Sequence, residues 1–252
     1  MTKIFLIILR LPFLIIHILT GLFILVFFPK NKLHLKKIHF SIAVVWMRIL
    51  IFIFGLQIQS KGEKNDGALV FVCNHVSFLD IIVLNSILPV SFVAKSEIEN
   101  WPIIGHLASK TGTIFIKRGV KESSDEIIPQ IQNHLANGNK ILFFPEGRIG
   151  DGVTVRKFHS KLFYSISKSK IKIQPVSIRY PKNYPEDLTT DNNLTWSDDS
   201  KALINVGLKC LGRFSTIVLV SFEDTIDTSN LEATEIAKLS ADSVVKSLSN
   251  LS

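Results

Sequence analysis

The sequence predicts an α/β fold in which a mostly parallel twisted sheet is flanked by helices and preceded by an N-terminal hydrophobic two-helix membrane segment. From residue 68 onward, short apolar runs of strand length alternate with helical patterns, which is typical of a parallel sheet covered by helices. Two long apolar segments occupy most of the first 56 residues. The length of 252 residues is enough for one large domain with a buried core.

Composition and charge narrow the class of protein. Hydrophobic residues make up 47% of the chain and the mean hydropathy is +0.32, which is high for a soluble protein and points to a membrane. The net charge of +8 arises in residues 1–62, which hold eight Lys or Arg side chains and no Asp or Glu. The remaining 190 residues balance 21 basic against 21 acidic groups, so no nucleic-acid partner is expected. Two cysteines in apolar runs make neither a disulfide scaffold nor a thiolate metal cluster.

The first apolar segment, residues 4–28, predicts an uncleaved membrane anchor. As a helix it would be about 37 Å long, which is enough to cross a bilayer. It is too long for the apolar region of a signal peptide, and residues 27–29 offer no small-residue cleavage site. A second segment, residues 40–56, contains Arg48, so it could span marginally, enter and return, or lie in the interface.

The connection between these segments, residues 29–39, carries four lysines and is expected on the cytoplasmic side by the positive-inside rule. If both segments crossed fully, this connection and the following domain would lie on opposite sides of the membrane. We therefore expect one span or re-entrant hairpin plus one interfacial helix, with residues 1–60 as membrane-anchoring helices with a basic loop. Residues 61–252 then form the main domain, on the cytoplasmic side of the membrane. The alternative, two buried core helices, is disfavoured because no acidic residue interrupts the first sixty positions.

Within the domain, strands and helices are expected in alternation. The expected strands are residues 68–73, 91–94, 114–117, 140–144, 172–179 and 216–222. One helix is expected over residues 123–137, ending at Gly138, and another over residues 158–168. Residues 181–200 are polar and predict an irregular surface excursion with Trp196 as its only large apolar side chain.

The first expected strand runs into residues 74–80, Asn-His-Val-Ser-Phe-Leu-Asp, where a helix is expected to begin. Ser77 and Asp80 have the spacing of a capping box, so Asp80 could simply complete the helix start. That alternative leaves His75 without a role. A carboxylate bonded to one imidazole nitrogen fixes the tautomer and leaves the other nitrogen basic, so His75 and Asp80 are candidates for a general base and its orienting partner.

Two further polar turns are expected at the same edge of the sheet. Residues 140–144 run into the turn 145–148, Pro-Glu-Gly-Arg, at a strand's carboxyl end, where open α/β sheets place their ligands. Residues 114–117 precede Arg118, whose guanidinium could bind a phosphate through two hydrogen bonds. The alternatives are a solvated Lys117 and Arg118 pair and a Glu that caps a turn.

Taken together, four blocks of residues 68–180 resemble the glycerolipid acyltransferase family, in addition to the membrane-seeking start. The first block is the Asn-His-x-Ser-x-x-Asp pattern of residues 74–80. The others are residues 95–105 with Trp-Pro, then Gly112 and residues 114–118; Phe-Pro-Glu-Gly at residues 144–147; and Gln-Pro-Val-Ser-Ile at residues 174–178. Four blocks in the right order are a far stronger signal than any one of them.

The resemblance implies an O-acyltransferase of phospholipid biosynthesis that moves a fatty acyl group from acyl-CoA or acyl carrier protein to the free hydroxyl of a lysophospholipid. His75 is then the general base and Asp80 holds it in register. Because a thioester is already activated, no enzyme nucleophile and no cofactor are expected, and the remaining histidines lack the spacing of a metal site. The residues implied in acceptor binding are Asn74, Arg118, Glu146, Gly147 and Arg148.

The acceptor has two candidates. The favoured one is 1-acyl-sn-glycerol-3-phosphate, which would yield phosphatidic acid, because Arg118 lies in an intact block. The third block, however, continues as Arg-Ile-Gly-Asp-Gly over residues 148–152 instead of Thr-Arg-Ser, which is similar to a proteobacterial branch of lyso-ornithine-lipid acyltransferases. Lyso-ornithine lipid is therefore the alternative acceptor. A non-catalytic membrane-anchored scaffold is the alternative of another class, although it would have no need of His75 and Asp80.

Overall fold

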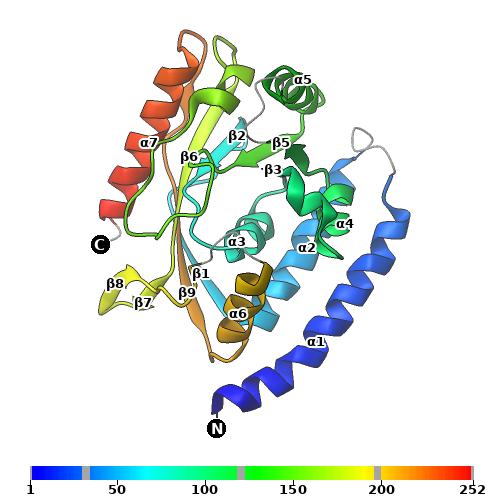
Figure 1. Cartoon of the computed structure of the whole chain (residues 1–252). Helices are drawn as coiled ribbons and strands as arrows, with labels where there is room; N and C mark the ends of the chain where they lie inside the picture. Colours follow the sequence, from blue (N-terminus) through cyan, green and yellow to red (C-terminus); the bar gives the residue numbers. More distant parts are fainter. Residues whose placement is uncertain (1, 30–34, 118–122, 196–199, 251–252) are drawn as a thin grey trace.

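A computed structural model of the chain describes residues 2–29, 35–117, 123–195 and 200–250 (Figure 1). The α-helices are α1 (Thr2–Ile24), α2 (Lys37–Phe54), α3 (Leu79–Ile87), α4 (Ile104–Lys110), α5 (Ser123–Ala136), α6 (Ser200–Leu211) and α7 (Ala233–Asn250). Short 3₁₀ helices are η1 (Leu25–Phe27), η3 (Ser96–Asn100) and η4 (Ser160–Ser165). The strands are β1 (Leu56–Lys61), β2 (Ala68–Cys73), β3 (Val90–Lys95), β4 (Ile114–Ile116), β5 (Lys140–Phe143), β6 (Lys172–Arg179), β7 (Pro181–Asn183), β8 (Asp187–Thr190), β9 (Thr216–Phe222) and β10 (Ile226–Asp227).

The main sheet has the strand order β1-β9-β6-β2-β5-β3-β4, with β10 beside β6. Neighbouring strands along this path run parallel except β6 and β9, and β10 is antiparallel to β6. β2 lies in the middle, with Val72 opposite Phe143 of β5 on one side and Pro175 of β6 on the other. The predicted mostly parallel sheet is confirmed, and each of the six expected strands is present.

Helices cover both faces of the sheet, as Figure 1 shows. Phe71 of β2 packs in one buried cluster with Leu50 of α2 and Leu84 of α3. Its neighbour Val70 points to the opposite face and packs in a second cluster with residues of α5, α7 and η4. This alternation along a strand that is buried on both faces accounts for the nearly continuous apolar run of β2 in the sequence.

The second N-terminal apolar segment belongs to the body of the protein. α2 contributes Leu50, Ile53 and Phe54 to the cluster beside the sheet. It ends at Gly55, whose left-handed φ of +68° turns the chain directly into β1. The expected domain boundary at residue 60 falls inside β1, which pairs with β9. α2 and β1 therefore share one core with the domain that was assigned to residues 61–252.

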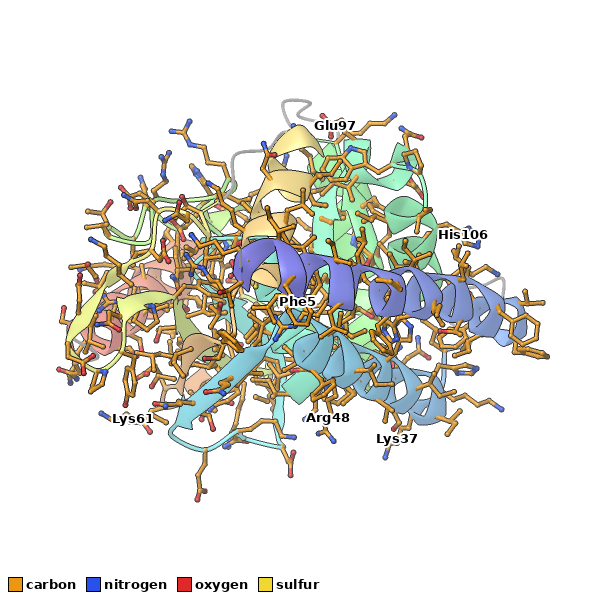
Figure 2. All side chains as sticks on the ribbon, turned by 90° about the horizontal axis from the view of Figure 1, so that it is seen from below. Phe5, Lys37, Arg48, Lys61, Glu97 and His106 are labelled. Atoms are coloured by element: carbon orange, nitrogen blue, oxygen red, sulfur yellow. The ribbon has the colours of Figure 1, made fainter. Side chains whose placement is uncertain are left out.

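α1 lies across the side of the molecule formed by α2, α4 and α6 (Figures 1 and 2). The guanidinium of Arg10 donates hydrogen bonds to the carbonyl oxygens of Leu211, Arg213 and Phe214 at the end of α6. Just beyond the other end of α1, η1 packs in a cluster with Leu107 of α4. By length and composition alone, α1 with η1 and α2 could each cross a membrane, with hydropathies of 2.3 and 1.9.

Two predicted segments differ from the structure. Of the helix expected over residues 158–168, only Ser160–Ser165 are helical, as the 3₁₀ helix η4, and serine side chains there bond to nearby carbonyls in competition with the α-helical pattern. Ser165 Oγ donates to the carbonyl of Leu162, and Ser169 Oγ donates to that of Ile166. Residues 181–190, expected to be irregular, include the antiparallel pair β7 and β8. Trp196 lies outside the described residues.

Candidate active site

The turns that follow β2 and β5 meet at the carboxyl edge of the sheet. The two strands are adjacent and parallel, so residues 74–80 and 144–150 leave the sheet side by side. Backbone contacts fasten the turns together: the N–H of Gly150 donates to the carbonyl of His75 at 2.7 Å. The N–H of His75 donates in turn to the Glu146 carboxylate at 2.8 Å. The first and third sequence blocks thus form one structural unit.

His75 and Asp80 lie in direct contact within this unit. His75 Nδ1 is 2.7 Å from Asp80 Oδ2, and the aspartate is fully buried. The same oxygen accepts the N–H groups of Val76 and Ser77 at 2.7 and 2.9 Å, so Asp80 also braces the helix start, as the capping alternative predicted. Because a carboxylate oxygen only accepts, Nδ1 carries the ring proton and Nε2 keeps its lone pair.

Tyr180, which the sequence patterns did not single out, binds the other carboxylate oxygen. Its hydroxyl donates to Asp80 Oδ1 at 2.7 Å, and the side chain is fully buried at the end of β6. Burial raises the pKa of Tyr180 well above its ordinary range, and the charge of Asp80 adds to that rise, so the hydroxyl stays a donor. The sequence feature that could have identified Tyr180 is its position immediately after a central strand, at the sheet edge where the site lies.

Asn74 connects β2 to β6. Its amide nitrogen donates to the carbonyl of Ile178 and its amide oxygen accepts the N–H of the same residue, both at 2.9 Å. The side chain is buried and lines neither of the two cavities described below. The amide therefore extends the strand pairing beyond Cys73, whereas the sequence had suggested a contact with the acceptor.

Glu146 also bonds to the backbone. One carboxylate oxygen accepts the N–H of His75, and the other accepts the N–H of Arg156 at 3.0 Å. Burial raises the pKa of Glu146 above its ordinary value of 4.5, and these two donors oppose the rise. Gly147 follows with a φ of +74°, and Gly150 passes so close that an added Cβ would lie 3.2 Å from the carboxylate. Glu146 and the glycines thus shape the wall of the site.

An apolar cavity of about 540 Å³ opens beside His75. Residues of α1, α2, α3, α4 and α6 line it, together with His75 and Phe144. The imidazole stacks on the Phe144 ring, with centroids 3.9 Å apart and planes 13° from parallel. The His75 side chain is 15% exposed. The imidazole is therefore fixed by Asp80 and by stacking on Phe144, and it borders the apolar cavity. A cavity with this lining suits a ligand that carries an acyl chain.

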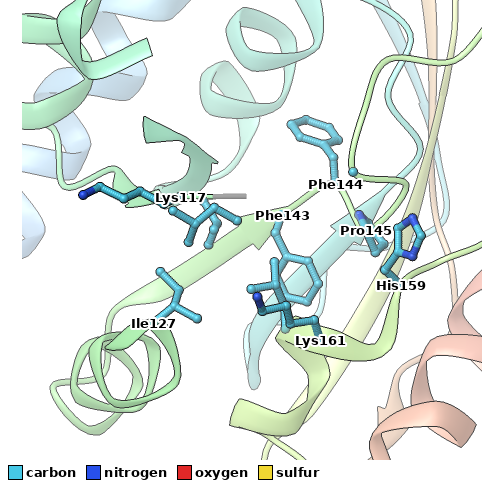
Figure 3. A pocket seen from close by; sticks show the side chains of 11 residues that line it. Lys117, Ile127, Phe143, Phe144, Pro145, His159 and Lys161 are labelled. Carbon is cyan, nitrogen blue, oxygen red and sulfur yellow. The ribbon is translucent and has the colours of Figure 1, made fainter. Parts of the chain in front are cut away.

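A smaller pocket of about 170 Å³ lies on the other side of Phe144 and Gly147, which line both openings (Figure 3). Three of its lining residues are basic or can become so: Lys117 at the end of β4, and His159 and Lys161 around the start of η4. Among the described residues that line it, none is acidic. The pocket therefore favours an anion a short distance from His75.

Arg118 and Arg148 were both predicted to bind the acceptor, and the structure describes only Arg148. Arg118 lies outside the described residues, although its neighbour Lys117 reaches the small pocket. Arg148 is exposed and lines the large cavity, while Gly147 lies between the two openings. From the sequence, His159 was examined only as a possible metal ligand. In the structure, a bend of the chain brings it next to Gly147, where the His159 N–H donates to the carbonyl of Pro145. No sequence pattern predicts this bend.

Metal and thiol chemistry have no support among the described residues. No group of three or more His, Cys, Asp or Glu side chains in that part of the chain could hold a metal ion. Cys73 is buried, and burial raises its pKa well above the ordinary value, with the nearby Asp80 and Glu146 charges adding to the rise. A thiol in this state is a poor nucleophile.

Known proteins with similar sequences are acyltransferases. A family model described as Acyltransferase matches residues 56–179. The lyso-ornithine lipid O-acyltransferase of Pseudomonas aeruginosa is 31% identical over 193 residues, which are 77% of this chain and 72% of that protein. The 1-acyl-sn-glycerol-3-phosphate acyltransferase of Neisseria gonorrhoeae is 32% identical over 126 residues, which are 50% of this chain and 49% of that protein.

A solved structure shares the fold. The 1-acyl-sn-glycerophosphate (LPA) acyltransferase PlsC from Thermotoga maritima matches with a TM-score of 0.69 and 19% identity, covering 100% of this chain and 98% of that one. The similarity thus extends over the N-terminal helices as well as the sheet. The resemblance drawn from the four sequence blocks is confirmed, and this chain belongs to the acyltransferase family that includes the lysophospholipid acyltransferases.

Proposed function

We propose that this chain transfers a fatty acyl group from a thioester donor to the free hydroxyl of a lysolipid at the membrane surface. One observation carries the proposal: His75, oriented by Asp80, lines a large apolar cavity and stacks on Phe144, which also lines a small pocket with basic residues. A lysolipid combines an acyl chain, a hydroxyl and a charged head group, in that order along the molecule. The three parts correspond to the cavity, the imidazole and the basic pocket.

The chemistry needs no covalent enzyme intermediate. His75 Nε2 accepts the proton of the hydroxyl while the oxygen attacks the thioester carbonyl. The carbon–sulfur bond then breaks, and the thiolate leaves with the proton from the imidazolium. Asp80 stabilises that imidazolium and keeps the ring in place, and general-base catalysis of this kind contributes roughly 10² to 10⁴ in rate. The donor is acyl-CoA or acyl carrier protein, since both present the acyl group as a thioester.

The lead acceptor is 1-acyl-sn-glycerol-3-phosphate, which would give phosphatidic acid. It is supported by the small pocket, whose described lining residues include Lys117, His159 and Lys161. A phosphate monoester brings up to two negative charges, which such a lining stabilises more than it stabilises a zwitterion.

Lyso-ornithine lipid is the second candidate. The similarity to the Pseudomonas aeruginosa enzyme spans 193 residues, against 126 for the Neisseria gonorrhoeae enzyme. An acid such as Asp151, in the Gly-Asp-Gly turn, would be needed to pair with the ornithine ammonium, and its Oδ1 accepts the N–H groups of Val153 and Thr154, both at 2.9 Å. Asp198, a second acid that could pair with the ammonium, lies outside the described residues.

We propose the cytoplasmic face of the inner membrane as the location. The lysines of residues 29–39 support this side by the positive-inside rule. α1 touches the body at both ends, through Arg10 and through η1, so it cannot cross the bilayer while the body stays in water. An arrangement in which α1 lies in one leaflet fits these contacts better than the full span considered from the sequence.

The test uses purified full-length protein in vesicles with a radiolabelled acyl thioester. Lysophosphatidate, lyso-ornithine lipid and lysophosphatidylcholine are supplied as acceptors in parallel. We expect an ester product from lysophosphatidate at the highest kcat/KM. Product from lyso-ornithine lipid alone would replace the acceptor while leaving the reaction in place. Absence of product from all three, with both donors, would contradict the proposed function.

A further inference from the structure

Three rings are stacked across three neighbouring strands at the site. β2, β5 and β3 are adjacent in the sheet, with His75 just after β2, Phe144 just after β5 and Phe92 within β3. The His75 and Phe144 rings have centroids 3.9 Å apart and planes 13° from parallel. The Phe144 and Phe92 rings are 16° from parallel, with centroids 6.3 Å apart. Phe144 therefore contacts the imidazole and is supported by a second, buried aromatic ring.

The strand register explains why Phe144 faces the imidazole. Phe92 lies opposite Leu142 of β5, so Phe144, two residues further on, is its diagonal neighbour on the same face of the sheet, within reach of an aromatic side chain. The preceding Phe143 packs on the opposite face, edge-on against Phe163 of η4. Alternation along the chain thus gives one phenylalanine to the core and the next to the site.

Two contacts hold the imidazole in different directions. The bond from Nδ1 to Asp80 lies in the ring plane and fixes where Nδ1 points. On its own it leaves the ring free to swing about the line of that bond. The stacking contact with Phe144 acts across the plane and fixes the tilt. An aliphatic side chain could also fix the tilt, so the aromatic character of Phe144 calls for a further explanation.

The charge that forms on His75 supplies that explanation. When Nε2 accepts a proton, the ring becomes a cation beside an apolar cavity, where it lacks much of the hydration that water would give it. The face of a phenylalanine ring carries the negative part of its quadrupole and attracts a cation within about 6 Å of its centroid. The distance of 3.9 Å places the His75 ring well inside that range.

Other charged groups reach His75 from different directions. Asp80, which Tyr180 also bonds, contacts Nδ1, and Glu146 accepts the backbone N–H of His75. The described residues that line the large cavity include three further charged side chains: Lys95, Glu97 and Arg148. The contact with the face of the imidazole is made by Phe144. Its contribution can therefore be altered while every one of these charges is kept.

We propose that Phe144 is a positioning residue that stabilises the imidazolium form of His75 through the face of its ring. The stabilisation is present when the acceptor hydroxyl has given up its proton and absent before, so it lowers the barrier of that step. Phe92 holds Phe144 against the imidazole from the far side. The effect on acyl transfer rests on the proposed function, whereas the attraction between Phe144 and charged His75 does not.

The first experiment changes the electron density of the Phe144 ring and keeps its shape. Site-specific incorporation replaces Phe144 with mono-, tri- and pentafluorinated phenylalanine in the full-length chain. Fluorine withdraws electron density from the ring face, and five fluorines reverse the sign of the quadrupole. The single-turnover rate constant of acyl transfer to lysophosphatidate should fall progressively, by about twofold for the first variant and about tenfold for the last. The KM for the acceptor should change little.

The matched control is the same series at Phe163. This ring is also buried, but it contacts Phe143 and lines neither of the two cavities. Its fluorination should leave the rate constant unchanged, and thermal unfolding checks that every variant is folded. A rate constant that is the same across the Phe144 series would show that the ring acts by packing alone and would overturn the proposal. An equal decline in the Phe163 series would do the same.

A second experiment observes His75 without acyl transfer. The chain is labelled with ¹³C at histidine Cε1 and placed in lipid nanodiscs, and His75→Ala assigns the resonance. The pH at which this resonance reports proton uptake should move lower along the Phe144 series, by up to about one pH unit for the pentafluorinated variant. A constant midpoint would overturn the proposal whatever the kinetics show. Absence of acyl transfer would contradict the proposed function and leave this measurement able to decide.

Discussion

Asp80 makes four hydrogen bonds with its two carboxylate oxygens, to His75, Val76, Ser77 and Tyr180. All four partners donate, so an amide in its place must turn an NH₂ group toward at least one donor. A single residue thereby joins the start of α3, the end of β6 and the imidazole. This explains why the capping and catalytic interpretations of Asp80 were both reasonable from the sequence.

Asp80→Asn should lower kcat by about 10²-fold, because the imidazolium loses its counter-charge and the ring loses its fixed tautomer. Tyr180→Phe is the matched variant, since it removes one donor and leaves the carboxylate. It should lower kcat less than Asp80→Asn does. Steady-state kinetics with the same acceptor would measure both, and equal losses would show that Asp80 acts mainly through the buried network and not through His75.

Glu146 gives a pH dependence of stability with a defined sign. Burial raises its native pKa above 4.5, so the folded state holds this proton at pH values where the unfolded state has lost it. The free energy of unfolding should therefore fall as the pH rises from about 4.5 through the raised native value. Glu146→Gln has no such proton. The wild-type free energy minus that of the variant should decline over this window, and a difference that grows with pH would contradict the assignment.

At the scale of single residues, the sequence predicted identities better than roles. His75, Asp80 and the Glu146 turn were found because a strand running into polar residues marks a sheet edge. The roles of Asn74 and Glu146 were not predicted. Both side chains bond to backbone N–H and carbonyl groups, and such partners leave no pattern in the sequence. Tyr180 was missed for a related reason: its contact with Asp80 joins residues 100 positions apart.

Arg10 shows how one element is fixed to the rest. Its guanidinium bonds to three carbonyl oxygens at the end of α6, in a helix whose other residues are almost all apolar. In the sequence, this arginine interrupts the apolar run of residues 4–28, which was predicted to anchor the chain in the membrane. The contact explains the interruption, because the unpaired carbonyls at a helix end attract a cation.

Arg10→Met should lower the free energy of unfolding by about 1 to 3 kcal/mol, because charge-assisted hydrogen bonds to the carbonyls are lost. Lys3→Met, a change of the same charge at an exposed position of the same helix, should have little effect. Thermal unfolding of the full-length variants in one detergent would compare them. An equal shift for both would indicate that only the charge of α1 matters.

The predicted elements were correct where their apolar pattern is long. Six of the seven strands along the main sheet were predicted, because burial on both faces gives the inner strands continuous apolar runs. β1 was not predicted, because only one residue, Gly55, separates it from the apolar helix α2. η4 was predicted as an α-helix because its apolar spacing is similar, while the serine bonds that end it depend on geometry.

For the whole molecule, the decisive feature is that one cavity is enclosed by both the N-terminal helices and the catalytic body. The sequence separated these parts at residue 60, because charge and hydropathy change there. The structure joins them, since α1 and α2 line the same cavity as His75. The catalytic body should accordingly depend on the membrane helices for its substrate site as well as for attachment.

Attachment should be insensitive to salt. About 1 M NaCl screens the basic residues of the N-terminal region but strengthens apolar burial, so the full-length chain should stay on anionic vesicles in a flotation assay. Detergent above its micelle concentration should release it and serves as the control. Complete release by salt would mean that charge, and not the exposed apolar surface of α1, dominates the attachment.

The central claim is that His75 activates the acceptor hydroxyl, and a single-turnover measurement of acyl transfer by His75→Ala tests it most directly. The variant and a control, His106→Ala at an exposed position of α4, are mixed with saturating labelled thioester and lysolipid in vesicles. The rate constant of the His75 variant should fall by about 10² or more while that of the control is unchanged. A His75→Ala protein that folds, binds vesicles and keeps more than about a tenth of the wild-type rate would contradict the account.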